Sequence, residues 1–253
     1  MATARSSSKQ KRMRLDFALV ERGLAETPQF AQALIMAGKV RVDEQPARKS
    51  GESVAAAARI EITDADSKYA SRAGLKLEGA LGDFGADVRG LVCLDVGASN
   101  GGFTDCLLQR GAKRVYAVDV NTAQLDWKLR RDARVVAVGK NARYLEPADI
   151  AEKVDFVTID VSFISAAKLI EAVAAIAKRG AMFLILVKPQ FELPKALVGK
   201  GGIARDAALH ARAIATVRSA AEKAGLEVLG VQPSRVMGKE GNQEYFLHAQ
   251  LPE

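Results

Sequence analysis

The sequence predicts an α/β domain with a mostly parallel sheet and an antiparallel edge strand, preceded by a small α+β domain. From Leu91 onward, short apolar runs alternate with helical patterns, one of which is the Ala-rich stretch 165–180. This alternation is typical of parallel strands covered by helices on both faces. The last two runs, "LEVLGVQ" and "NQEYFLHAQL", have no helix between them, so we expect them to pair antiparallel at one edge. The chain before residue 64 carries few large apolar residues, which favours a separate small domain.

Length and composition agree with two domains. The chain has 253 residues, 49% of them hydrophobic, enough for one core of ordinary size and a smaller one. Cys93 and Cys106 lie inside apolar patterns, and the two histidines are His210 and His248, so we expect no disulfide framework and no metal site. No apolar stretch approaches the roughly 18 residues that span a bilayer, and no signal peptide is evident. We therefore expect a soluble, cytoplasmic protein without a membrane partner.

Residues 1–13 are predicted to form a disordered basic arm. The opening "MATARSSSKQKRMR" contains no acid, and small polar residues separate its bases, which are Arg5, Lys9, Lys11, Arg12 and Arg14. The chain as a whole has a net charge of +7, which suits a polyanionic partner. A solubilising tail is the alternative interpretation of the arm.

Residues 14–63 contain two short helical patterns followed by strand patterns. The first helix begins near Leu15 and is expected to end at Gly23. Thr27 is expected to cap a second helix that has Pro28 in its first turn and stops near Gly38. The stretch "KVRVDEQPARKSGESV" then alternates and turns like small strands. A polar linker, residues 64–70, leads to the α/β domain at residues 71–253.

This N-terminal pattern resembles the alpha-L RNA-binding domain, which a ribosomal small-subunit protein shares with pseudouridine synthases. The resemblance implies that the two helices present basic residues to structured RNA. Members of that family usually open the second helix with a Ser/Thr-Arg pair, whereas this chain has Thr27-Pro28-Gln29 and so lacks one expected phosphate contact. The candidates to compensate are the arm and four basic residues, Lys39, Arg41, Arg48 and Lys49.

The first strand of the α/β domain leads into a glycine-rich turn. In "CLDVGASNGGFTDCLLQRGAKRVYAVDVN", Gly97 and Gly101 let the backbone approach a ligand, and Asp119 ends the second strand, where it can accept hydrogen bonds from two ribose hydroxyls. The spacing is not G-x-G-x-x-G, so a pyrophosphate is not specifically encoded. Asp95, expected inside the loop, adds negative charge and favours cationic S-adenosyl-L-methionine over a dinucleotide.

Two polar residues complete the predicted cofactor site. Ser99 lies within the glycine-rich turn, and Asn141 follows the third strand, where a polar group could face an adenine. A tight connection without a ligand is the alternative for the turn, and an ordinary turn asparagine is the alternative for Asn141.

Two later strands each end at a charged residue. Asp160 follows the strand in "FVTIDVSFIS", and Lys188 follows the strand in "FLILVKPQFE". Because the carboxyl ends of parallel strands meet at one rim and consecutive strands commonly lie side by side, we expect an Asp160–Lys188 pair in the cofactor cleft. A structural ion pair is the alternative.

Two further charges depart from their local patterns. Lys76 lies in "SRAGLKLEGALGDF", a helical pattern in which Leu75, Leu77 and Leu81 should face inward. Glu244 opens the last strand in "GNQEYFLHAQL". Taken singly, each is more often a solvated charge.

Six segments in order resemble the TlyA (hemolysin A-like) family of ribosomal RNA methyltransferases, whose catalytic domain is similar to FtsJ-type 2′-O-methyltransferases. They are "SRAGLKLEGAL", "CLDVGASNGGFTDCLLQRGA", "TIDVSFIS", "LVKPQFE", "GKGGIARD" and "GNQEYF". The resemblance implies a Rossmann-like methyltransferase that uses S-adenosyl-L-methionine and no metal to methylate a ribose 2′-hydroxyl, that of cytidine, in ribosomal RNA or a ribosomal subunit. It also implies a catalytic tetrad at Lys76, Asp160, Lys188 and Glu244.

Methyl transfer to a ribose hydroxyl needs an aligned oxygen and a proton acceptor. Lys188 is the candidate acceptor, but a free lysine is protonated at neutral pH. Asp160 stabilises the charged amine, whereas Lys76, a bound sulfonium and burial favour the neutral amine. The hypothesis is that Lys188 loses its proton only once the cofactor is bound.

Other acceptors and other functions make different demands on the sequence. Amine methylation usually uses an Asp/Asn-Pro-Pro-aromatic turn, whereas this chain has Asp160-Val161-Ser162-Phe163; pyrimidine carbon methylation needs a cysteine nucleophile, and Cys106 is on the wrong helix. A non-catalytic RNA-binding or ribosome assembly factor would keep the basic arm and tolerate loss of Lys188. A cytolysin, suggested by the family's older name, would need an amphipathic or spanning segment, and we find none.

Overall fold

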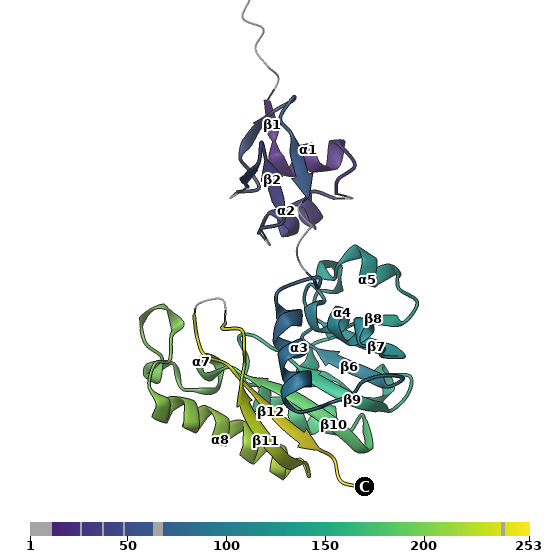
Figure 1. The fold of residues 1–253 in the computed structure, drawn as a ribbon, viewed down its shortest axis with the longest axis vertical. Helices are drawn as coiled ribbons and strands as arrows, with labels where there is room; N and C mark the ends of the chain where they lie inside the picture. Colours follow the sequence, from purple (N-terminus) through teal and green to yellow (C-terminus); the bar gives the residue numbers. More distant parts are fainter. Residues whose placement is uncertain (1–11, 26, 37, 48, 63–67, 239–240) are drawn as a thin grey trace, which may run out of the picture. The chain divides into compact units, whose positions relative to one another are not determined.

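The computed structural model describes residues 12–25, 27–36, 38–47, 49–62, 68–238 and 241–253 (Figure 1). The chain divides into two compact units, Met1–Ser67 and Lys68–Glu253. Some of the residues singled out in the sequence lie outside the described ranges: Arg5, Lys9 and Lys11 of the basic arm, Arg48, and residues 64–67 of the expected linker.

The N-terminal unit consists of two short helices and two small sheets. Its elements are β1 (Arg12–Arg14), α1 (Leu15–Glu21), α2 (Pro28–Met36), β2 (Val40–Val42), β3 (Gln45–Pro46), β4 (Ser53–Ala55) and β5 (Ile60–Ile62). In the part of this unit that the structure describes, β1 pairs antiparallel with β4, and β2 lies between β3 and β5. The elements pack around a small apolar core that includes Leu15, Leu19, Leu34, Val40 and Ile60.

The start of this unit corrects the predicted arm. Arg12 and Met13, expected within a disordered arm over residues 1–13, belong to β1 because their backbone pairs with β4. The second helix has the expected cap, since Thr27 Oγ1 accepts a hydrogen bond from the backbone N–H of Phe30 at 3.2 Å. Gly38, which has a φ of 71°, follows that helix in the left-handed conformation that commonly ends helices.

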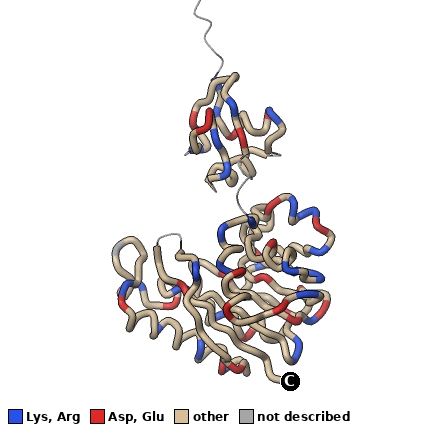
Figure 2. The backbone as a smooth tube through the Cα atoms, in the orientation of Figure 1, with Lys and Arg blue, Asp and Glu red and all other residues tan. Residues whose placement is uncertain are grey.

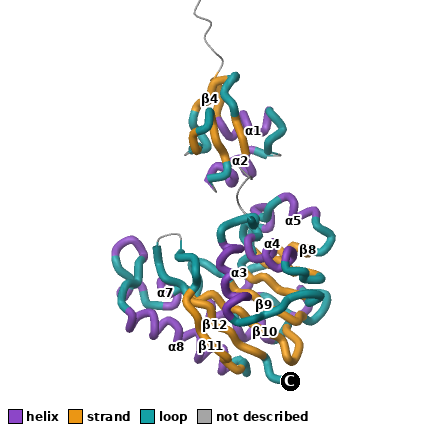
Figure 3. The backbone as a smooth tube through the Cα atoms, viewed as in Figure 1, coloured by secondary structure: helices purple, strands orange, loops and turns teal. Residues whose placement is uncertain are grey.

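The larger unit is a sheet with helices on both faces (Figure 3). Its strands are β6 (Val92–Val96), β7 (Arg114–Asp119), β8 (Val135–Gly139), β9 (Val154–Ile159), β10 (Ala177–Val187), β11 (Glu227–Pro233) and β12 (Tyr245–Gln250). Its α-helices are α3 (Ala73–Asp83), α4 (Gly102–Gln109), α5 (Trp127–Arg131), α6 (Ile170–Ala174), α7 (Pro189–Glu192) and α8 (Ala207–Lys223). The short 3-10 helices are η1 (Thr122–Gln124), η2 (Ala142–Tyr144), η3 (Pro147–Asp149), η4 (Ala166–Lys168), η5 (Lys195–Leu197) and η6 (Lys200–Gly202).

The seven strands of this sheet within the described residues have the order β11-β12-β10-β9-β6-β7-β8. Strands β6 to β10 pair parallel to one another, whereas β12 pairs antiparallel with both β10 and β11. The predicted mostly parallel α/β sheet is confirmed. The antiparallel strand lies second from the edge, because the chain makes the edge strand β11 first and then inserts β12 beside β10.

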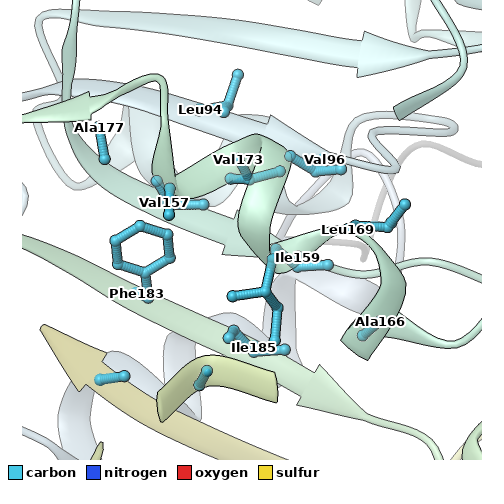
Figure 4. Packing of buried hydrophobic residues seen from close by; sticks show 14 of the residues in the cluster. Leu94, Val96, Val157, Ile159, Ala166, Leu169, Val173, Ala177, Phe183 and Ile185 are labelled. Atoms are coloured by element: carbon cyan, nitrogen blue, oxygen red, sulfur yellow. The ribbon is translucent and has the colours of Figure 1, made fainter. Parts of the chain in front are cut away.

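Each face of the sheet has its own apolar core. On one face, side chains of β6, β9 and β10 meet α6, and Figure 4 shows Val157, Ile159 and Phe183 around Val173. On the other face, α3 and α4 place Leu77 and Leu107 against the sheet. Figure 2 shows that charged positions gather on helices and loops while the strands are largely uncharged. Successive residues of these strands are buried in the cores on opposite faces of the sheet, which explains the continuous apolar runs in the sequence.

Two local predictions were wrong. The Ala-rich stretch 165–180 was expected to form one helix, but it forms η4 and α6 and then enters β10 at Ala177, which pairs with Val154. Its alanines are small enough for either conformation, and sheet pairing overrides their helix propensity. On α3, Leu77 and Leu81 are buried as expected, but Leu75 is 42% exposed and Lys76 is buried.

The chain reverses its direction of travel across the sheet at β6. From β6 it continues to β7 and β8 on one side, and it then returns to β9 on the other side of β6. In such sheets, ligands bind outside the carboxyl ends of the strands at this reversal. Gly97 follows β6 and Asp160 follows β9, so both residues stand at that position.

Candidate active site

A cleft of about 500 Å³ opens at the carboxyl ends of β6, β7, β8 and β9. Its volume is in the range of small-molecule and cofactor sites. Most of its walls are apolar, and the polar or exposed residues that line it include Gly97, Ser99, Asp119, Asn141, Asp160, Ser162 and Phe163. Five of the ten residues predicted from the sequence therefore lie around one cleft.

Glycines let the backbone form the floor of this cleft. Gly97 has a φ of 88°, and a Cβ there would lie 2.3 Å from the carbonyl oxygen of Asp160. Gly101, with a φ of 90°, precedes α4, and a Cβ there would overlap the side chains of Leu129 and Leu125. Neither position can accept a larger residue without rearrangement, so these glycines bring the loop after β6 close to its neighbours.

Asp119 ends β7, and backbone amides orient its carboxylate. The N–H of Ser99 donates to Oδ2 at 2.9 Å, and the N–H of Asn121 donates to Oδ1 at 3.0 Å. Each carboxylate oxygen retains a further lone pair that a ligand hydroxyl could use. Asn141 lines the same cleft while its Oδ1 accepts a hydrogen bond from the N–H of Arg143 at 3.0 Å, so a turn role and a ligand contact through its NH₂ group are compatible.

Asp95 lies in β6 beneath the glycine-rich loop, not inside the loop as expected, and its side chain is fully buried. Thr104 Oγ1 donates to its Oδ2 at 2.6 Å, and Thr158 Oγ1 donates to its Oδ1 at 3.1 Å. Burial raises the pKa of the Asp95 carboxyl to about 7, although the two threonine hydrogen bonds oppose the shift. Asp95 is therefore not a permanent negative charge beside a ligand at neutral pH, which corrects the role inferred from the sequence.

Asp160 and Lys188 form a nearly buried ion pair at the ends of β9 and β10. Lys188 Nζ lies 2.6 Å from Asp160 Oδ1, and the two side chains are 10% and 14% exposed. The contact is close, yet Oδ1 makes no hydrogen bond of normal geometry within the described residues. Lys188 Nζ does donate a hydrogen bond, at 3.0 Å, to Ser162 Oγ. Asp160 thus supplies charge, and Ser162 supplies the directional contact.

Lys76 and Glu244 form a second buried ion pair. Lys76 Nζ, from α3, donates to Glu244 Oε2 at 2.5 Å, and both side chains are less than 10% exposed. A Cβ on Gly238 would lie 2.6 Å from Glu244 Oε1, so the loop between β11 and β12 passes directly against this carboxylate. Arg72 Nη2 donates to the Met237 carbonyl at 2.7 Å, which ties the same loop to the residue before α3.

Strand register brings the two ion pairs together. Val187 of β10 pairs with Tyr245 of β12, so the next residues, Lys188 and Glu244, stand opposite each other at the end of the two strands. The four residues predicted as a tetrad therefore gather at one rim of the sheet. Their formal charges cancel, because each lysine has its own carboxylate. Because Lys76 is paired with Glu244, it repels the positive charge of Lys188 less strongly than an unpaired lysine would.

Three residues at this rim escaped the sequence analysis as candidates. Ser162 accepts from Lys188, and Phe163 is 94% exposed with a φ of 67°, which is unusual for a residue that is not glycine. Phe191, on α7, has its ring 5.4 Å from that of Phe163 and 5.9 Å from Lys188 Nζ. The signal available in the sequence was their position next to the charged strand ends, in "DVSF" and "KPQF".

The N-terminal unit presents fewer basic side chains to a ligand than its composition indicates. Arg14 Nη2 lies 2.7 Å from Asp16 Oδ2, and Arg12 donates to the Ser53 carbonyl at 2.5 Å. Arg41 and Lys49 are exposed. Arg41 and Lys49 are therefore better candidates for contacts with a polyanion than Arg12 and Arg14.

Among the described residues, no group of three or more His, Cys, Asp or Glu side chains could hold a metal ion. Within the same residues, every helix is too short or too polar to cross a membrane.

The sequence matches two known families in separate regions. Residues 69–251 match the FtsJ-like methyltransferase family, and residues 13–60 match the S4 domain. The first match contains all ten predicted site residues. The second match covers α1, α2 and strands β2 to β4 of the N-terminal unit, and it ends at the first residue of β5.

Individual relatives are similar over almost the whole chain. The 16S/23S rRNA (cytidine-2′-O)-methyltransferase TlyA of Mycobacterium tuberculosis is 47% identical, with 94% of this chain and 89% of the relative covered. Hemolysin A of Brachyspira hyodysenteriae is 39% identical, with 93% and 99% covered. A solved structure from Streptococcus thermophilus, described provisionally as a hemolysin, is 40% identical in sequence and has a TM-score of 0.74. The superposition covers 96% of this chain and 90% of that one.

Proposed function

The chain belongs to the TlyA (hemolysin A-like) family, with an FtsJ-like methyltransferase domain and an S4 domain, and from this premise we propose that it methylates the ribose 2′-hydroxyl of a cytidine in ribosomal RNA. It is a methyltransferase by family. The observation that supports this acceptor best is the meeting of two buried lysine–carboxylate pairs beside the cleft. A hydroxyl acceptor needs a group to take its proton, and Lys188 can do so.

We propose S-adenosyl-L-methionine as the cofactor of the cleft. Gly97 leaves room where any side chain would collide with Asp160, and Asp119 offers two oriented carboxylate oxygens to a ribose. The volume and largely apolar lining suit an adenosine. When bound, the cofactor supplies an electrophilic methyl group on a sulfonium. Gly97, Ser99, Gly101, Asp119 and Asn141 are the proposed binding residues, with Asp95 supporting the loop from below.

The acceptor residues act on the ribose hydroxyl. Lys188 Nζ would take the hydroxyl proton, and the bound cofactor would supply the methyl group that the ribose oxygen accepts. Asp160 then stabilises the ammonium that results. Lys76 and Glu244 balance each other, so they form a neutral polar wall rather than a source of positive charge.

The S4 domain is the proposed RNA-binding unit. Its exposed Arg41 and Lys49 can contact phosphates, which position an RNA without reading its sequence. Phe163, exposed at the mouth of the cleft, offers a ring on which a base could stack, and such stacking contributes about 1–3 kcal/mol per base. The rRNA acceptor itself is proposed from the activity named for the relative in Mycobacterium tuberculosis.

A methylation assay tests the proposal. Isolated small and large ribosomal subunits lacking the modification would be incubated with the protein and methyl-labelled cofactor, and the labelled nucleotide would be located by its resistance to alkaline cleavage. Lys188→Ala should abolish incorporation. Lys178→Ala is the matched control, because Lys178 lies on the same strand and pairs with Asp155 near its other end.

The outcomes separate three functions. Label at a cytidine ribose that depends on Lys188 supports the proposal, whereas label on a base contradicts the 2′-hydroxyl acceptor. Tight binding to a subunit with no incorporation by wild type would instead support a non-catalytic assembly factor. Lysis of erythrocytes by wild type and Lys188→Ala alike would support a cytolysin, the activity that the name of the Brachyspira relative carries.

A further inference from the structure

Within the described part of the chain, two polar side chains, those of Asp160 and Ser162, contact the Lys188 amine, and they do so in different ways. Asp160 Oδ1 lies 2.6 Å from Nζ but makes no hydrogen bond of normal geometry, so its attraction is electrostatic and has little directional preference. Ser162 Oγ lies 3.0 Å away and accepts the one side-chain hydrogen bond that Lys188 donates within the described residues. Within the described residues, Ser162 is therefore the side chain that gives the amine a directional hydrogen bond, in addition to its ion pair with Asp160.

Because an amine nitrogen is tetrahedral, a hydrogen bond from Lys188 Nζ to Ser162 also limits where its lone pair can point. A neutral Nζ has two N–H groups and one lone pair in tetrahedral positions, and the lone pair must face the hydroxyl proton for transfer to occur. One N–H is directed at Ser162 Oγ, and Asp160 attracts the other. Rotation about the last carbon–nitrogen bond is then restricted, and the third position is left for the acceptor.

The loop that carries Ser162 is itself held in place. Glu192, on α7, accepts hydrogen bonds from Ser165 Oγ at 2.5 Å and from the N–H of Ala166 at 2.7 Å. Phe163, between Ser162 and these anchors, has a φ of 67°, a conformation that costs energy for a bulky residue and persists where its surroundings impose it. Because α7 starts directly after Lys188, the lysine and the loop are fixed to the same short helix.

We propose that Ser162 is a positioning residue that directs the Lys188 amine toward the acceptor hydroxyl. This inference rests on the proposed methyltransferase function and adds to it a residue outside the Lys76–Asp160–Lys188–Glu244 set. Ser162 does not itself exchange a proton with the substrate. Its hydroxyl oxygen accepts from Lys188, and its removal leaves Lys188 paired with Asp160 but free to rotate.

Kinetics of three variants test the inference. Ser162→Ala should lower kcat by about 10- to 100-fold, because small misplacements of a reacting group have effects of this size, while KM for the cofactor and for the ribosomal subunit stays within about 2-fold, the expected range for an unchanged binding contact. Ser162→Thr keeps the hydroxyl and should recover most of the activity. Thr216→Val is the control, since it removes an exposed hydroxyl on α8 whose hydrogen bond goes to the Arg212 carbonyl and not to Lys188; it should leave kcat within about 2-fold of wild type.

Several results would overturn the inference. A kcat for Ser162→Ala within about 2-fold of wild type would do so, given that lost orientation should cost at least tenfold. A raised KM for cofactor with unchanged kcat would place Ser162 in cofactor binding instead. Failure of a folded Ser162→Thr to recover activity would show that the hydroxyl is not what matters. Ser162 is exposed, so the alanine variant is expected to fold, and its melting temperature checks this.

A crystal structure of Ser162→Ala tests the orientation of Lys188 without depending on activity. Lys188 Nζ should leave its position or become poorly ordered, whereas an unchanged, ordered Nζ would contradict the inference. If wild type methylates no RNA, the proposed function fails by that result alone. The position of Nζ in the variant then still decides whether Ser162 orients the lysine.

Discussion

The two halves of the proposed active site, the cleft for the cofactor and the rim beside it for the acceptor, rely on different kinds of interaction. The cofactor half is made of backbone: Gly97 and Gly101 give close approach, and backbone amides orient Asp119. The acceptor half is made of charged side chains, paired and almost fully buried. The first half depends on residues near one another in sequence, whereas Lys76 and Glu244 are 168 residues apart. Changes in the first half should therefore affect ligand binding, and changes in the second should affect the chemical step or the stability of the domain.

The sharpest test of this division is Lys188→Arg. Arginine keeps the positive charge and can still pair with Asp160, but it does not release its proton in proteins. We expect kcat to fall by roughly 10²- to 10⁴-fold, the usual contribution of a general base, with little change in the cofactor dissociation constant. Single-turnover methylation and calorimetric cofactor binding measure the two quantities. Wild-type turnover by this variant would refute the assignment of Lys188 as the proton acceptor.

Breaking the Lys76–Glu244 pair should mainly affect stability. Glu244→Ala leaves Lys76 buried without its partner, which typically costs about 3–5 kcal/mol of unfolding free energy. The double variant Lys76→Met/Glu244→Leu replaces both charges by apolar groups and should regain most of that stability, measured by urea unfolding, without regaining activity. If the double variant were as active as wild type, the pair would have no part in the reaction.

Gly97→Ala tests the cofactor half. Its positive φ and the 2.3 Å approach of a Cβ to the Asp160 carbonyl oxygen force the loop away from β9. We expect the cofactor dissociation constant to rise by about 10- to 100-fold, as the loss of roughly 1.4–2.7 kcal/mol implies. At saturating cofactor, kcat should fall less. A larger fall in kcat than in affinity would show that the loop also positions the acceptor residues.

Asp95 lies beneath the cofactor half, and its titration gives the smallest predicted effect. The pKa of its carboxyl is raised to about 7 in the folded protein, well above the value of an unfolded chain. From about pH 4 to pH 7 the folded state holds a proton that the unfolded state has lost, so this group's contribution to stability falls as the pH rises through that range and is constant above it. Asp95→Asn should remove that loss, which is on the order of 2 kcal/mol between pH 5 and pH 8.

The measurement for Asp95 is the melting temperature of wild type and Asp95→Asn across that pH range. The wild-type curve should drop more steeply toward pH 8 than the variant curve. Parallel curves would mean that the burial of Asp95 does not control its protonation. Thr104→Val removes one of the hydrogen bonds that lower this pKa, so in that variant the loss of stability should continue to a higher pH than in wild type.

The sequence predicted most of the fold and the local half of the site. Alternating apolar runs are sufficient to predict the parallel sheet and the antiparallel pair at its end, because burial on both faces imposes that pattern. The region around Gly97 and Asp119 could be read as a cofactor loop because one strand–turn–helix–strand unit contains it. Ala177 was misassigned because alanine suits a helix and a strand almost equally well in that context.

The acceptor half was harder to predict from the sequence. Helix periodicity predicted Leu75 inside and Lys76 outside, and the opposite holds because Lys76 meets Glu244 from the last strand. A family resemblance, not a local pattern, placed those two residues in the site. Ser162 was missed because nothing in the segment "DVSF" distinguishes this serine from an ordinary loop serine until Lys188 is found 26 residues away, on the neighbouring strand.

The position of β12 has a consequence for synthesis of the chain. It is the last strand in the order of translation, yet it inserts between β10 and β11, and it follows directly from Glu244. Until it emerges from the ribosome, β10 has an unpaired edge and Lys76 has no carboxylate partner. The segment up to β10 can therefore form its glycine-rich loop before the sheet is complete, whereas insertion of β12 covers the edge of β10 and brings Glu244 to Lys76 in a single step.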